Sequence, residues 1–184
     1  MRQALGHLRF RWLAMSLLLV ACAGCTERVP KEALVLTQTP LAPVGATAED
    51  RLDLRYPPCS RVILTWPPFR PSEVRLLSKG LLAAGGPIVS HDERRVLFAG
   101  KADPSSAWQI YEARLGGGRP KPVTAMAGGA MQPALLPTGD LVFSSPVPKI
   151  AEGWTNALPA ALYAQSPGGP PRRLTFGSVG AFDP

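Results

Sequence analysis

Two stretches of this chain share one pattern of residues, and that pattern decides the fold. The first is Pro87-Ile-Val-Ser-His-Asp-Glu-Arg-Arg-Val-Leu-Phe98, and the second is Pro133-Ala-Leu-Leu-Pro-Thr-Gly-Asp-Leu-Val-Phe143. Each begins with proline and short apolar residues, passes through a polar turn, and ends in an apolar triplet with phenylalanine last. The prolines are 46 residues apart and the phenylalanines 45. Self-similarity at such a spacing indicates a repeated structural unit.

The similarity continues downstream of both stretches. Ile110-Tyr111 matches Leu162-Tyr163, and Gly116-Gly-Gly-Arg-Pro-Lys-Pro-Val-Thr124 matches Gly168-Gly-Pro-Pro-Arg-Arg-Leu-Thr175. Extra residues in the second copy fall in a proline-rich stretch before Leu162, which indicates a longer loop. We place the repeats at about 87–132 and 133–182, and Asp183-Pro184 matches the start of a further copy.

Each unit predicts short strands. Residues 87–90, 96–99 and 108–115 are short runs, rich in β-branched and aromatic residues and bounded by polar turns, as strands are. Glycines 116–118 predict a chain reversal, because glycine adopts positive φ at little cost. Val123-Thr124 then begins an outer return strand. Upstream, residues 33–36, 61–65 and 74–77 are further strand candidates.

The run Val96-Leu97-Phe98 is apolar on both faces, which suits a sheet stacked between two others. Such a unit cannot bury its own faces, so its neighbours supply the stability. We therefore expect Phe98 and Phe143 in the core.

The repeat resembles that of TolB-like, WD-type β-propellers, whose pattern is roughly Ser-Pro-Asp-Gly, an apolar strand with Phe, Ile-Tyr, Gly-Gly and Leu-Thr. Residues 98–101 and 108–111 are also similar to propeller proteins related to the hydrazine synthase alpha subunit. The resemblance covers about residues 74–184. The chain departs from it at His91 and Glu93, where the family has Pro and Gly, so we expect this turn to differ locally.

The resemblance implies an all-β fold, a partial β-propeller of about two to three four-stranded blades. Closed propellers have at least about four blades, whereas residues 22–184 have room for about three. Either the chain is a fragment of a larger propeller, or the ring closes with another chain.

The N-terminus has the pattern of a secretory signal. Arg2, Arg9 and Arg11 precede an apolar run at 12–21, which is too short to span a bilayer. Leu19-Val20-Ala21-Cys22 resembles the bacterial lipobox, which implies a lipid on Cys22, with Cys25 as the alternative. We expect a signal peptide at 1–21, a tether and lead-in segment at 22–57, and blades at 58–184. Neither cysteine is followed by Asp, which favours the outer over the inner membrane.

Charge and cysteine content exclude several functions. The net charge is +7, and removal of residues 1–21 takes away three positive charges, leaving +4 without a nucleic-acid-binding pattern. The Cys22–Cys25 spacing lacks the second pair that a zinc site needs and the histidine that haem attachment needs. Cys25 and Cys59 form a disulfide only if Cys22 carries the lipid, and the sequence does not decide whether they pair.

Catalytic and binding candidates are weak. Ser90-His91-Asp92 lies in one predicted turn, whereas triad members meet from separate elements, and Asp103 and Glu112 have no identifiable partner. The glycines at 116–118 and 128–129 predict turns, and Trp108 and Tyr111 predict blade packing. We expect no catalytic, cofactor-binding or metal-binding residue and no cofactor.

The expected function is that of a lipoprotein anchored on the periplasmic face of a bacterial membrane. Its blades would bind an envelope protein partner through loops at 100–107 and 146–159. We expect no enzymatic activity of its own. The alternative is an accessory propeller domain or subunit of a larger enzyme, a peptidase or redox complex, whose catalytic part lies outside this chain.

Overall fold

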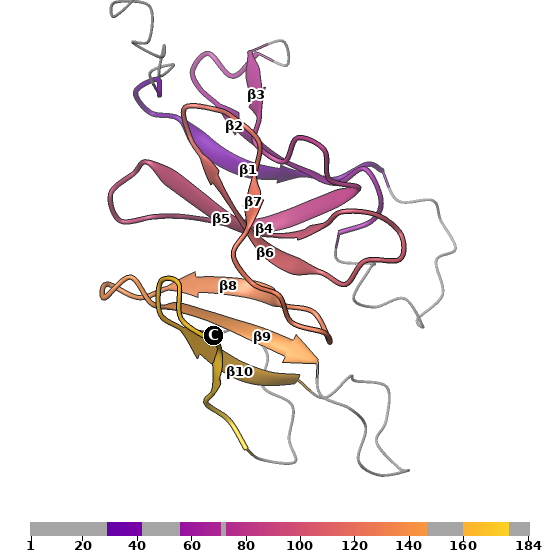
Figure 1. The fold of residues 1–184 in the computed structure, drawn as a ribbon. Coiled ribbons are helices and arrows are strands. Elements are labelled where there is room, and N and C mark those ends of the chain that lie inside the picture. Colours follow the sequence, from indigo (N-terminus) through magenta and orange to yellow (C-terminus); the bar gives the residue numbers. More distant parts are fainter. Residues whose placement is uncertain (1–28, 42–55, 71–72, 147–159, 177–184) are drawn as a thin grey trace, which may run out of the picture.

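The computed structural model describes residues 29–41, 56–70, 73–146 and 160–176, and these residues form three antiparallel sheets (Figure 1). The expected signal peptide, Cys22, Cys25 and residues 147–159 lie outside the described residues. Within the described ranges, no helix is long and apolar enough to cross a membrane.

The two sequence repeats form two four-stranded sheets with the same strand order. The second sheet contains β4 (Ala83–Val89), β5 (Arg95–Lys101), β6 (Gln109–Arg114) and β7 (Lys121–Pro122). The third sheet contains β8 (Met131–Leu135), β9 (Leu141–Pro146), β10 (Ala160–Gln165) and β11 (Arg172–Arg173). In both sheets every strand pairs with the next one along the chain, as the repeat predicts.

The first sheet contains β1 (Leu34–Gln38), β2 (Arg61–Thr65) and β3 (Val74–Leu76). It is a copy of the last three strands of the other two sheets, and one hydrogen bond identifies the copy. The Val62 N–H donates to Ser78 Oγ (3.1 Å), as Ile110 donates to Thr124 Oγ1 (2.9 Å) and Leu162 to Thr175 Oγ1 (2.9 Å). The sequence repeat did not reveal this copy, because only the hydroxyl residue and the apolar run of the middle strand persist in it. β1 lies inside the segment 22–57, for which the sequence predicts a tether and lead-in.

The first strand of each four-stranded sheet carries a bulge beside its proline. Gly86 (φ 63°) precedes Pro87 and Gln132 (φ 52°) precedes Pro133, and the strand pairing shifts at these points. Proline has no N–H for the ladder, so a bulge is a place where a strand accommodates it. β4 continues on both sides of this bulge, so it begins at Ala83, upstream of the predicted run at 87–90.

The turn at His91 and Glu93 differs locally from its counterpart in the second copy, as expected, because it is one residue longer, although both turns contain a residue with positive φ. Glu93 adopts φ 55°, where the second copy has Gly139 at φ 88°. The Glu93 N–H donates to the Ser90 carbonyl (2.9 Å), and the Gly139 N–H donates to the Leu136 carbonyl (2.9 Å). The turn closes between Ser90 and Arg95 in the first copy, and between Leu136 and Asp140 in the second. This one-residue difference explains why the repeat spacing falls from 46 to 45.

The core consists of two apolar layers, each between adjacent sheets. One layer joins Val62 and Leu64 of the first sheet to Phe98 of the second. The other joins Leu97 of the second sheet to Phe143 of the third. Phe98 and Phe143 are fully buried, as predicted. The Phe98 ring stacks on the Tyr111 ring, with 6.4 Å between the ring centroids, and the Phe143 ring stacks on the Tyr163 ring, with 5.8 Å between them.

The second sheet thus lies between the other two, as propeller blades do (Figure 1). The predicted fold class, an all-β partial β-propeller, is confirmed.

Candidate functional site

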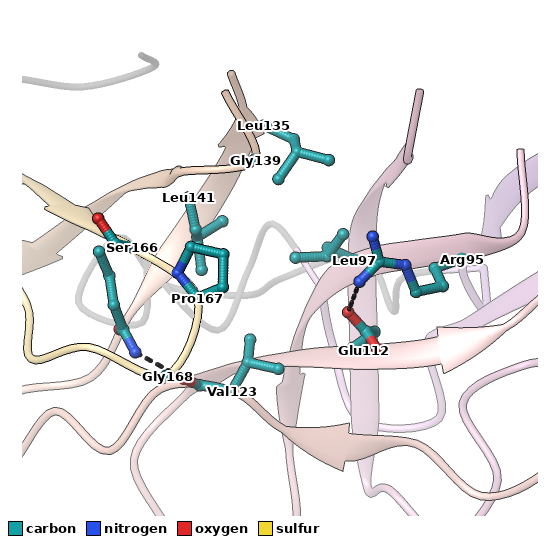
Figure 2. A pocket seen from close by; sticks show the side chains of 11 residues that line it. Arg95, Leu97, Glu112, Val123, Leu135, Gly139, Leu141, Ser166, Pro167 and Gly168 are labelled. Carbon is teal, nitrogen blue, oxygen red and sulfur yellow. Dashed lines mark hydrogen bonds and ion pairs between the residues drawn. The ribbon is translucent and has the colours of Figure 1, made fainter. Parts of the chain in front are cut away.

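A cavity of about 240 Å³ opens between the second and third sheets (Figure 2). Residues of β5 and β6, residues around the β8–β9 turn, the end of β10 with the segment after it, and one residue after β7 line it. They are Arg95, Leu97, Glu112, Val123, Leu135, Gly139, Leu141, Gln165, Ser166, Pro167 and Gly168. Ligand pockets for drug-sized molecules measure about 300–1,000 Å³. The cavity therefore suits water molecules or a small chemical group better than a metabolite.

One wall of the cavity carries an ion pair. Arg95 Nη1 lies 3.1 Å from Glu112 Oε2, and Arg95 Nε lies 3.8 Å from Asp92 Oδ2. Figure 2 shows the Arg95–Glu112 pair facing the apolar side chains of the third sheet across the opening. Glu112, an acid–base candidate in the sequence, thus has a basic partner that the sequence did not identify. Leu97 and Glu112 lie opposite each other in the β5–β6 register, which only the strand pairing reveals.

Gln165 forms a hydrogen bond between the third and second sheets at the cavity. Its Nε2 donates to the Val123 carbonyl at 3.1 Å, while its buried Oε1 has no hydrogen-bond partner among the described residues. A buried acceptor of this kind is usually satisfied by ordered water. No sequence pattern pointed to this residue, because a lone glutamine at the end of a strand is usually solvated.

The residues Ser90, His91 and Asp92 do not form a catalytic triad, in agreement with the sequence interpretation. Ser90 Oγ donates to Asp92 Oδ1 and accepts from the Arg95 N–H (3.0 Å). His91 Nε2 lies 3.3 Å from the Leu135 carbonyl of the third sheet, so the imidazole contacts backbone and not the serine. The Ser90 hydroxyl lowers the pKa of the exposed Asp92 carboxyl, with the Arg94 N–H as a second cause.

Asp103 organises the exposed loop between β5 and β6. Its Oδ1 accepts from the Ser105 N–H (2.9 Å), the Ser105 hydroxyl (2.7 Å) and the Ser106 N–H (2.9 Å). The Ser106 hydroxyl oxygen in turn accepts from the N–H groups of Ala102 and Asp103. Chiefly because the Ser105 hydroxyl stabilises the carboxylate, the pKa of Asp103 lies below its usual value.

Trp108 and Tyr111 are packing residues, as predicted. Both are buried. The Trp108 ring lies beside the Tyr56 ring, with 6.0 Å between their centroids, and the Tyr111 ring stacks on Phe98. Burial raises the pKa of the Tyr111 phenol. Gly117, Gly118 and Gly129 have positive φ in turns, also as predicted.

Cys59 is an exposed free cysteine. Its pairing with Cys25 remains untested, because Cys25 lies outside the described residues. Within the described ranges, no three His, Cys, Asp or Glu side chains gather as a metal site would require.

No protein-family model and no curated protein matches this chain. Among solved structures it is similar to Kuenenia stuttgartiensis hydrazine synthase, with a TM-score of 0.67 and 17% sequence identity. The similarity covers 88% of this chain and 27% of that one, so the chain spans about a quarter of the neighbour's length. At this identity the similarity establishes a shared propeller-like fold.

Proposed function

We propose that this chain is an exported, membrane-tethered lipoprotein whose propeller blades bind a protein partner in the cell envelope. The observation that carries the binding role is the loop at 102–106. It is exposed, yet the Asp103 carboxylate and the Ser106 hydroxyl fix its backbone. Binding loops that are already ordered lose less conformational entropy when a partner docks, which favours affinity.

The partner experiment compares two aspartates that each organise an exposed turn. The tagged full chain is crosslinked in envelope preparations, the captured protein is identified, and its affinity for purified chain is measured. Asp103→Ala should weaken binding about tenfold, because it frees the backbone N–H groups of the loop. Asp92→Ala is the matched control in the β4–β5 turn and should leave the affinity unchanged. Equal affinities for wild type and Asp103→Ala would contradict the binding role of this loop.

The tether is supported by the basic and apolar N-terminal pattern and by the lipobox-like sequence ending at Cys22. We expect Cys22→Ser to abolish lipid attachment and to move the chain out of the membrane fraction. Cys25→Ser should leave both unchanged. Mass spectrometry of the N-terminal peptide distinguishes the two cysteines, because the diacylglyceryl group adds mass only to the acceptor. A chain that stays membrane-bound without either cysteine would contradict the tether.

A second candidate function is an accessory propeller of a larger enzyme. The specific observation in its favour is the similarity to hydrazine synthase, of which the chain matches only a part. Sequencing the gene beyond codon 184 tests this candidate. A Gly-x-Ser-x-Gly or CxxCH motif downstream would favour it, whereas a stop codon would favour the binding module.

A further inference from the structure

The turn before β1 corresponds to the turn between the first two strands of the other sheets. Glu32 adopts φ 58° two residues before Leu34 begins β1, and Gly139 adopts φ 88° two residues before Leu141 begins β9. The turn at 29–33 therefore lies at the end of its sheet that matches the β4–β5 and β8–β9 turns of the other two sheets.

Exposed apolar side chains gather at this end of the first sheet. Leu34 lies opposite Thr65, and Thr65 lies opposite Val74, so the turn before β1 is close to the segment that follows β2 (Figure 1). Val29, Leu34, Phe69 and Val74 are between 39% and 51% exposed. We call these four side chains the end patch.

The aromatic part of the end patch is not required by the repeat. The segment after β2 is Trp66-Pro-Pro-Phe-Arg70, whereas the turns after β6 and β10 are Leu115-Gly-Gly-Gly-Arg119 and Ser166-Pro-Gly-Gly-Pro170. Glycine and proline close these two turns without a large exposed side chain. An exposed Phe69 thus distinguishes the first sheet, and clustered exposed apolar groups mark interaction sites.

Positive charge surrounds the end patch. Arg75 Nη1 donates to the Leu115 carbonyl (2.7 Å), and this bond holds the β6–β7 turn of the second sheet at the same end. The charged side chains in and beside the three turns are Lys31, Arg70, Arg75, Arg114, Arg119, Glu32 and Glu73. Five cations and two anions give a net charge of +3, which favours an anionic partner surface.

The end patch is also the part of the described fold that is nearest in sequence to the proposed lipid. Cys22 precedes Val29 by seven residues, and Cys25 precedes it by four. A fully extended chain spans at most about 3.6 Å per residue, so either cysteine lies within about 25 Å of Val29. The lipid-bearing membrane is therefore within reach of this end of the molecule.

The loop at 102–106 lies at the other end of the second sheet. β5 begins at Arg95, where the β4–β5 turn closes, and the loop follows its last residue, Lys101. Arg95 pairs with Arg114, so the β6–β7 turn is at the Arg95 end as well. The loop and the end patch are thus separated by the length of the strands.

We propose that the end patch rests on the surface of the membrane that holds the lipid, so that the loop at 102–106 faces away from the bilayer. The inference rests on the lipid tether proposed above and adds an orientation to it. Phenylalanine and aliphatic side chains enter the boundary between headgroups and acyl chains, and Lys and Arg are attracted to anionic phospholipids. The combination of both kinds of side chain selects a bilayer as the occupant.

Site-specific fluorescence tests this orientation. Phe69→Cys and, as the matched control, Ala102→Cys are each made in the full chain with Cys59→Ser, expressed with its own signal and labelled with a polarity-sensitive thiol probe. Each chain is reconstituted into phosphatidylethanolamine–phosphatidylglycerol vesicles with or without lipids that carry a quencher. We expect the quencher to dim the probe at position 69 several-fold more than the probe at 102. The Cys59→Ser chain without an added cysteine gives the background.

Flotation of the same vesicles separates failure of the inference from failure of the tether. Chains that float with the vesicles but show equal quenching at both positions, stronger quenching at 102 or none at either would overturn the orientation alone. Chains that do not float would overturn the tether and the orientation with it.

A second variant tests the end patch itself. With the probe on Val74→Cys, Phe69→Asp should reduce the quenching, because a charged side chain is excluded from the apolar boundary. Val89→Asp changes a similarly exposed residue of β4 and should leave the quenching unchanged. Circular dichroism verifies that both variants are folded. Equal quenching in folded Phe69→Asp and Val89→Asp chains would show that the end patch is not the membrane contact.

Discussion

At the scale of single residues, the two central phenylalanines carry much of the packing. Each is fully buried and stacked on a tyrosine of the neighbouring strand. We expect Phe98→Ala to lower the free energy of unfolding by about 3–5 kcal/mol, through lost burial and the cavity left behind. Thermal unfolding measures the effect, and Phe176→Ala, at an exposed position, should be nearly neutral. An unchanged melting temperature for Phe98→Ala would contradict the assigned core.

Backbone strain distinguishes the two β-turns of the repeat. Glu93 adopts a left-handed conformation that costs a non-glycine residue roughly 1–2 kcal/mol, whereas Gly139 adopts the equivalent one without a Cβ atom. We expect Gly139→Ala to destabilise the chain by about 1 kcal/mol. Glu93→Gly should stabilise it by up to about 1 kcal/mol, since the relieved strain exceeds the added unfolded-state entropy. Denaturant unfolding measures both, and shifts of the same sign would refute the assigned turn geometry.

The Asp103 carboxyl links the β5–β6 loop to pH. Its pKa is lower in the folded chain than in the unfolded one, chiefly because of the Ser105 hydroxyl. The carboxylate therefore stabilises the ordered loop fully above the ordinary aspartate pKa of 3.8, and this contribution is lost as the pH falls through the lowered pKa. An NMR titration of the Asp103 carboxyl carbon should show a midpoint below the usual 3.8. Ser105→Ala should move it upward, and an unmoved midpoint would show that the hydroxyl is not the cause.

At the scale of elements, one hydroxyl group joins the last strand of each sheet to the strand before it. Thr124 Oγ1 accepts from the buried Ile110 N–H and also donates to Gln109 Oε1 (2.8 Å). We expect Thr124→Val to cost about 1–3 kcal/mol, because a buried N–H loses its acceptor. Thr124→Ser should retain most of the stability, since Ser78 makes the same bond in the first sheet. Chemical unfolding of the two variants measures the difference, and equal losses would assign the effect to packing.

At the scale of the whole molecule, the three sheets depend on one another. Neither face of the second sheet is buried without a neighbour, because the two apolar layers lie between sheets and not within them. We therefore expect the described sheets to unfold in one cooperative transition. Near- and far-ultraviolet circular dichroism should melt at the same temperature. Two separated transitions would show that the sheets are independent.

The sequence by itself determined the strand-rich fold class, the repeated four-stranded unit, and the buried Phe98 and Phe143. These follow from local chemistry: residue periodicity, the positions of proline and glycine, and the recurrence of one pattern along the chain. The sequence did not predict that the first sheet is a copy of the repeat. This sheet retains the hydrogen-bonding hydroxyl of Ser78 but not the phenylalanine or the paired glycines of the other copies.

Only the tertiary structure decided which groups meet across strands and sheets. It paired Arg95 with Glu112, placed Gln165 against the Val123 carbonyl, and left Leu36 exposed where Phe98 and Phe143 are buried. The physical reason is that these contacts depend on strand register and on the neighbour of each blade. Neither the register nor the neighbouring blade follows from the spacing of residues along a single strand.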